Sequence, residues 1–151
     1  MIFNLEELVS TQKDRVGQFG GITLVDGSFD PLHHGHIEYF KEALTLGNKL
    51  GCLIAPDSYT KRKHKVLIPQ SSRASIIDWL SGIDYVFYGE IETQLALEFI
   101  RPKIFFKGPD WRERIPKEII KTCYELDCEI RFGQTKLASS NEILRNLNSS
   151  E

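Results

Sequence analysis

Short β-rich runs alternate along this chain with segments whose apolar residues have helical spacing, and this alternation restricts the fold more than any other feature. The expected strands are 22–26, 49–55, 84–88, 103–108 and 128–132. The expected helices are Leu5 to about Gly17, 36–46, 71–80, 92–100, 115–126 and 139–147. Strands separated by helices predict an α/β fold, in which a single Rossmann-like, doubly wound parallel sheet of about five strands carries helices on both faces.

Length and charge limit the alternatives. The 151 residues predict a single domain, 1–151, with a frayed polar tail at 146–151. Three cysteines, an odd number in a chain of this length, do not predict a disulfide framework. The acidic start and the lack of a long apolar stretch predict a cytoplasmic protein without a membrane anchor. A net charge of −2 disfavours nucleic acid or a membrane as partner.

The loop after the first expected strand is the most informative segment, because doubly wound sheets bind ligands beyond the carboxyl ends of their strands. It reads DGSFDPLHHGH. Gly27 and Ser28 allow a tight turn, and Gly35 lets the backbone approach a phosphate at the start of the next helix. His33 and His36 are nearly one helical turn apart, so both rings can face one pocket. The sequence therefore predicts an anion site with two titratable imidazole donors.

Three histidines within four residues are also compatible with a zinc or nickel site. However, no thiolate or carboxylate partner stands at a recognisable ligand spacing, so no metal ligands are predicted. His34 is expected to be a partly exposed residue without a catalytic role. The anion site is the better interpretation of this loop.

The sequence Phe-Asp followed by His-x-Gly-His resembles the hallmark of the cytidylyltransferase-like nucleotidyltransferase superfamily. The segments NLEEL and KGPDW are similar to the nucleotidyltransferase portion of bacterial ADP-heptose synthase, and GPDW is also similar to glycerol-3-phosphate cytidylyltransferase. FDPLHHGH further resembles the adenylyltransferases of coenzyme A and nicotinamide cofactor synthesis. KGPDW fits the sugar and polyol enzymes better. The resemblance therefore implies an enzyme of the sugar and polyol group.

The resemblance implies roles for individual residues. It makes His33, His36 and Lys61 catalytic, although 61–65 can also be a solvated basic loop. Arg62 and Arg73 would bind the acceptor's phosphate, with a structural ion pair as the alternative for Arg73. The residues that it places in the nucleotide pocket are Gly27, Ser28, Phe29, Asp30, Gly35, Lys107, Gly108, Asp110, Trp111, Thr135, Ser139 and Ser140.

The segment before the last expected helix departs from the family pattern. Gln134 stands where an arginine is often found, Leu137 replaces a common glycine, and Asn141 replaces a threonine. Ser139 and Ser140 can bind phosphate, but they can equally be simple helix caps. These departures leave open a catalytically weakened module that binds or senses nucleotides.

The reaction implied by the resemblance is nucleotidyl transfer. A phosphate oxygen of a small phosphorylated acceptor attacks the α-phosphorus of ATP or CTP, and pyrophosphate leaves. The expected cofactor is Mg²⁺, carried mainly by the triphosphate. Heptose 1-phosphate is the favoured acceptor, and a glycerol-3-phosphate-type cytidylyltransferase is the alternative. Dimers are usual among such relatives, so a homodimer is a further expectation.

Overall fold

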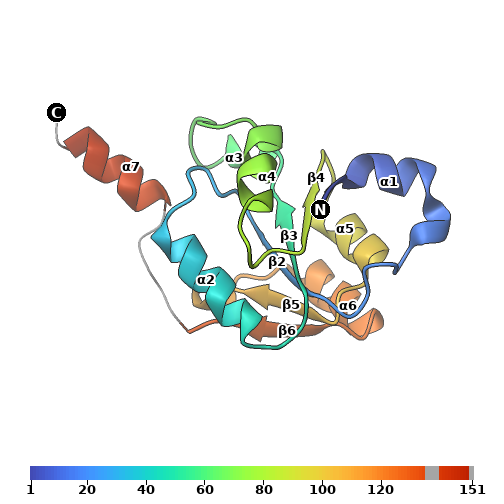
Figure 1. Ribbon diagram of the computed structural model, residues 1–151. Coiled ribbons are helices and arrows are strands. Elements are labelled where there is room, and N and C mark those ends of the chain that lie inside the picture. Colours follow the sequence, from blue (N-terminus) through green and yellow to red (C-terminus); the bar gives the residue numbers. More distant parts are fainter. Residues whose placement is uncertain (135–139, 150–151) are drawn as a thin grey trace.

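Parallel strands form one sheet in the order β1-β4-β3-β2-β5-β6 (Figure 1). The computed structural model describes residues 1–134 and 140–149, and all six strands lie in the first of these ranges. The strands are β1 (Ile2–Asn4), β2 (Thr23–Gly27), β3 (Leu50–Ile54), β4 (Tyr85–Tyr88), β5 (Ile104–Lys107) and β6 (Glu129–Phe132). The predicted α/β class and parallel sheet are confirmed, with one strand more than expected.

Helices connect the strands at nearly the predicted positions. They are α1 (Leu5–Thr11), α2 (His34–Leu44), α3 (Asp57–Thr60), α4 (Gln70–Asp78), α5 (Thr93–Ile100), α6 (Lys117–Glu125) and α7 (Ser140–Ser149), with 3-10 turns η1 (Lys13–Arg15) and η2 (Pro109–Trp111). Asn4 caps α1, since its side chain accepts a hydrogen bond from the Glu7 amide at 3.1 Å. Residues 146–149 belong to α7, and 150–151 lie outside the described residues.

The sequence analysis missed two short elements. The three residues of β1 come directly before the α1 cap, so they form no apolar run of ordinary strand length. Their strand conformation depends on pairing with β4, where Ile2 lies opposite Val86. Helix α3 is a single turn, and four residues are too few to show a helical period.

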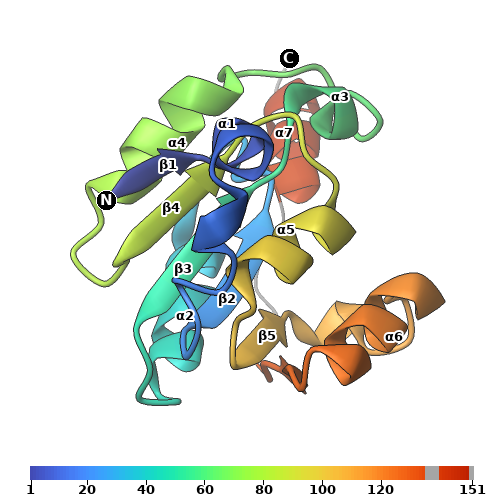
Figure 2. The ribbon, with the colours of Figure 1, turned by 90° about the vertical axis from the view of Figure 1, so that its right-hand side faces the viewer.

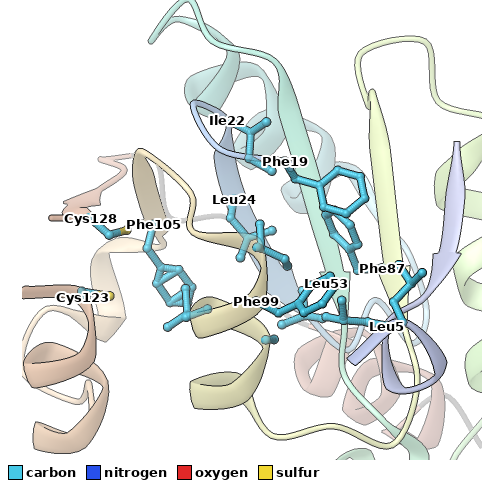
Figure 3. Close-up of a cluster of buried hydrophobic side chains, with 14 residues drawn as sticks. Leu5, Phe19, Ile22, Leu24, Leu53, Phe87, Phe99, Phe105, Cys123 and Cys128 are labelled. Carbon is cyan, nitrogen blue, oxygen red and sulfur yellow. The ribbon is translucent and has the colours of Figure 1, made fainter. Parts of the chain in front are cut away.

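Helices cover both faces of the sheet (Figures 1 and 2), and an apolar cluster lies on each face. Helices α1, α5 and α6 pack on one face, where Leu5, Phe99 and Cys123 are buried against the strands (Figure 3). Helices α2 and α4 pack on the other face through Phe40 and Ile77. Each fully buried large apolar side chain stabilises the fold by about 1.5–3 kcal/mol, so both layers hold the sheet.

The sheet opens between β2 and β5. Strand β2 pairs with β3 along its whole length, from Thr23 to Gly27, but pairs with β5 only at Thr23 and Leu24. Beyond that point the Tyr39 hydroxyl donates to the carbonyl of Phe106 at 2.5 Å. The strand order also reverses between β2 and β5, because the chain proceeds from β2 to β3 and β4 and then returns to β5. This is the switch point at which doubly wound sheets bind ligands.

All three cysteines, Cys52, Cys123 and Cys128, are free and buried, as the sequence predicts. Within the described ranges, no helix has the length and apolar character needed to cross a membrane.

Candidate active site

A cleft of about 1150 Å³ lies over the carboxyl ends of β2, β3, β4 and β5. Its volume exceeds that of a usual single-ligand pocket, about 300–1000 Å³, so a nucleotide and a second small molecule fit together. Twelve residues predicted from the sequence line it: Gly27, Ser28, Phe29, Asp30, His33, Gly35, His36, Arg62, Lys107, Gly108, Asp110 and Trp111.

The two motif histidines form one unit at the start of α2. Their rings stack with centroids 3.8 Å apart and an interplanar angle of 29°. His33 caps the helix, because its Nδ1 accepts from the Gly35 amide at 3.0 Å. In return the His33 amide donates to Nδ1 of His36 at 3.2 Å. Since both Nδ1 atoms accept hydrogen bonds, each neutral ring carries its proton on Nε2.

Burial determines the charge of this pair. It lowers the pKa of His36 to about 3, with the neighbouring His33 ring adding to the effect. Burial also lowers the pKa of His33, although the Glu142 carboxylate opposes that shift. Nε2 of His33 is buried and has no hydrogen-bond partner among the described residues. The pair therefore presents neutral N–H donors near pH 7.

Phe29 and Asp30 shape the loop that carries the histidines. Phe29 has a left-handed backbone (φ 52°), and its ring packs edge-on against His36 at 4.9 Å. A Cβ on Gly27 would lie 3.0 Å from the Phe29 ring, which explains the glycine there. The buried Asp30 carboxylate accepts from the backbone amides of Leu67 and Ile68, at 2.8 and 2.9 Å. Asp30 thus anchors the loop to the segment before α4.

Arg73 does not reach the cleft, which corrects its predicted role on the acceptor's phosphate. Its side chain is fully buried. The guanidinium donates to the carbonyls of Ser28 at 2.6 Å, Ala55 at 2.9 Å and Ile68 at 2.8 Å. It also pairs with the Asp57 carboxylate at 2.5 Å. The structural ion pair weighed in the sequence analysis is the observed state, because all three guanidinium nitrogens donate to groups of the protein.

Lys61 is also absent from the cleft lining, whereas Arg62, Lys63 and His64 contribute to it. Lys61 ends the single turn of α3 and is exposed. The Lys63 ammonium lies 4.9 Å from the centroid of the Tyr59 ring. Because α3 was not predicted, the side of the basic segment that faces the cleft could not be assigned from the sequence, and the structure places Lys63 rather than Lys61 on the cleft lining.

Lys107 belongs to an ion pair that lines the cleft where β2 and β5 separate. Its ammonium pairs with the Asp26 carboxylate at 2.6 Å and lies 4.1 Å from the centroid of the Trp111 ring. The side chains of Lys107 and Asp26 are only 8% and 18% exposed. Lys107 and Trp111 were predicted here, but Asp26 was not singled out.

The loop after β4 and the start of α5 supply residues of the cleft that the sequence analysis missed. They are Glu90, Ile91, Glu92, Thr93 and Gln94. They carry no motif, and their only signal is their position just after a strand.

Most of the segment that was predicted to bind phosphate lies outside the described residues. Thr135 and Ser139 lie outside the described residues, and Ser140 begins α7. The cleft does reach α7, because Glu142 lines it.

Comparison with known proteins agrees with the motif. Residues 24–146 match the family described as Cytidylyltransferase-like. An FAD synthase of Halomicrobium mukohataei is 31% identical over 125 residues, which cover 80% of this chain and 86% of that protein. The bifunctional protein HldE of Nitratiruptor sp. is 31% identical over 132 residues; the match covers 83% of this chain but only 29% of that longer protein.

A solved structure has the same fold. The lipopolysaccharide core biosynthesis protein from Thermoplasma volcanium superposes with a TM-score of 0.67 at 25% identity, over 78% of this chain and 98% of that one. This chain therefore shares its fold with a protein of known structure.

Proposed function

This chain belongs to the cytidylyltransferase-like family and is a nucleotidyltransferase, and from that premise we propose that it transfers AMP or CMP from ATP or CTP to a phosphorylated sugar or polyol. Pyrophosphate is the second product. Heptose 1-phosphate is the leading acceptor, as the similarity to HldE supports. The observation that carries the proposal is the stacked pair His33 and His36, whose Nε2–H groups are left for a ligand in the cleft.

The histidine pair suits in-line displacement at phosphorus. A phosphate oxygen of the acceptor forms a bond to the α-phosphorus as the bond to the pyrophosphate oxygen breaks. Negative charge grows on the oxygens around the α-phosphorus, and donors fixed in advance stabilise it without reorganisation. His33 and His36 supply such donors, and they lie at the N-terminus of α2, the positive end of the helix dipole. The acceptor phosphate is already ionised, so the step needs no general base.

The cleft residues fit a Mg²⁺ ion that enters with the triphosphate. No cluster of three or more histidine, cysteine or acidic side chains suited to a metal ion occurs among the described residues. Mg²⁺ usually keeps several waters and takes one or two carboxylates plus substrate phosphates. Asp110, which lines the cleft and is 46% exposed, would be the protein carboxylate nearest to this role. When bound, Mg²⁺ would neutralise charge on the leaving pyrophosphate.

The relatives named FAD synthase support a second candidate, adenylyl transfer to a flavin phosphate. The polar side chains of the cleft favour the first candidate, transfer to a phosphorylated sugar or polyol. At the β3 and β4 end the cleft is lined by both cations and carboxylates, among them Arg62, Lys63, Glu90 and Glu92. The largely aromatic ring system of a flavin offers these charges fewer hydrogen bonds for its size than a hydroxyl-rich phosphate does.

Pyrophosphate release from a matrix of substrates tests the proposal. ATP and CTP are each offered with heptose 1-phosphate, mannose 1-phosphate, sn-glycerol 3-phosphate or flavin mononucleotide, with and without Mg²⁺. We expect Mg²⁺-dependent release with a sugar or polyol phosphate. Release only with flavin mononucleotide would favour the second candidate, and heat of nucleotide binding without release from any acceptor would indicate a weakened binding module.

A further inference from the structure

We infer that Glu90 reads the hydroxyl groups of the acceptor, and that Ser58, Glu6 and Gln70 hold Glu90 in the position that this requires. The inference rests on the proposed transfer to a phosphorylated sugar or polyol. Glu90 is exposed, follows β4 and lines the cleft.

Glu90 is fixed from two sides. The Ser58 hydroxyl, from the first turn of α3, donates to the Glu90 carboxylate. The Glu90 backbone amide donates to the carboxylate of Glu6, in the first turn of α1, at 3.0 Å. The side chain and the backbone of Glu90 are therefore held separately, and the carboxylate has a defined position beside α3.

Gln70 sets the spacing of the two loops that carry this pair. Its side-chain amide donates to the carbonyls of Ile54 and Gly89, both at 3.0 Å. Ile54 ends β3, which leads to Ser58, and Gly89 follows β4 and precedes Glu90. One amide thus ties the ends of two neighbouring strands, and Gln70 acts as a positioning residue.

The residue before Glu90 has no room for a side chain larger than that of glycine. Gly89 has φ 134°, and a Cβ there would lie 2.9 Å from Cβ of Glu6 and 3.0 Å from its backbone nitrogen. Only glycine accepts this backbone and this close approach. The turn therefore fixes where the Glu90 carboxylate enters the cleft.

The side chains on this side of the cleft suit an acceptor that has a phosphate at one end and hydroxyl groups at the other. An ionised carboxylate only accepts hydrogen bonds, and sugar hydroxyls donate them. The chain continues from Ser58 through α3 to Arg62, Lys63 and His64, which also line the cleft and can take the phosphate end. Phosphate on the basic residues and hydroxyls on Glu90 satisfy both signs of charge at once.

The test compares Glu90→Gln with the matched control Glu98→Gln. Glu98 lies in α5, is absent from the cleft lining and accepts a hydrogen bond from Gln94. KM and kcat are measured with mannose 1-phosphate and its 2-deoxy analogue. Nucleotide affinity is read from Trp111 fluorescence in a Trp79→Phe background, because Trp79 is 90% exposed and is absent from the cleft lining.

We expect Glu90→Gln to raise KM for mannose 1-phosphate about tenfold, because a hydrogen bond to a charged group is lost. The ratio of KM values between the two acceptors should shrink, and nucleotide affinity should change less than about twofold. Gln70→Leu should raise the acceptor KM in the same direction, with kcat changed less. Glu98→Gln should match the parent in every measurement.

The inference is overturned if the parent uses mannose 1-phosphate and Glu90→Gln keeps the parental acceptor KM, or weakens nucleotide binding instead. That result would leave the proposed function standing. If the parent transfers to no sugar or polyol phosphate at all, the proposed function itself is wrong.

Discussion

The two ends of the cleft are built on different principles. At the β2 end, His33 and His36 are half-buried and neutral, and backbone amides fix their tautomers. At the β3 and β4 end, Arg62 and Glu90 are exposed and charged. The imidazole donors that serve the reaction at phosphorus are held in place before the substrate binds. The side chains that would select the acceptor are exposed to water. Substitutions should therefore act on turnover at one end and on acceptor affinity at the other.

The largest expected effect is at the histidine end. His33→Ala and His36→Ala should each lose about 10²–10³ in turnover, the usual loss for one donor to a developing oxyanion. His34→Ala is the matched control, because His34 lies between them but its side chain is 77% exposed. Pyrophosphate release at saturating substrate measures the effect. Near-parental turnover in a folded His33 or His36 variant would remove that residue from the catalytic set.

Substitutions of Arg73 and Arg62 should differ in their effect on the free energy of unfolding. Arg73→Met leaves the buried end of this network without its cation, so that three carbonyls and Asp57 lose their donor, and the free energy of unfolding should fall by about 3–5 kcal/mol. Arg62→Met, at an exposed site, should stay within about 0.5 kcal/mol of the parent. Urea unfolding followed by circular dichroism measures both. Equal losses in the two variants would contradict the structural assignment of Arg73.

Acid should destabilise the histidine end. The pKa of His36 is about 3 in the folded protein, below the ordinary value of 6.5. Between these values the unfolded chain binds a proton that the folded chain does not, so stability falls as the pH falls from 6.5 towards 3, by about 1.4 kcal/mol per pH unit. Above pH 7 this contribution is constant. His36→Gln should flatten the dependence of the unfolding free energy on pH, and an unchanged slope would contradict a neutral buried His36.

The smallest expected effect is within the basic segment. Arg62→Ala should raise KM for the acceptor about three- to fivefold, the worth of an exposed ionic contact. Lys61→Ala should leave KM unchanged, because Lys61 does not line the cleft. Steady-state kinetics over a range of acceptor concentrations compare the two variants. The reverse order of effects would restore the sequence-based choice of Lys61.

Local patterns were sufficient to predict the fold and the histidine loop. Strands such as 50–54 are continuous apolar runs between turn residues, and helices such as α2 repeat apolar residues at helical spacing. The motif around His33 and His36 predicted a loop at the correct switch point. Such features depend on neighbours in the sequence and can be read from it.

The errors concern residues whose role is decided by distant partners. Arg73 binds the carbonyl of Ser28, 45 positions earlier in the chain, and this pairing has no local signal. Glu90 depends on Glu6, 84 positions away. Burial likewise decides whether the histidines titrate, and burial follows from the packed fold rather than from the motif.

The central claim is that two neutral imidazoles donate through Nε2 to the nucleotide, and ¹⁵N NMR of histidine-labelled protein tests it directly. For His36 we predict a neutral ring protonated on Nε2 throughout pH 6–8, and for His33 a pKa below its ordinary value with the neutral ring protonated on Nε2. Both Nε2–H resonances should shift when a non-hydrolysable ATP or CTP analogue is added. A proton on Nδ1, titration of both rings near pH 6.5, or resonances unmoved by either analogue would contradict the account.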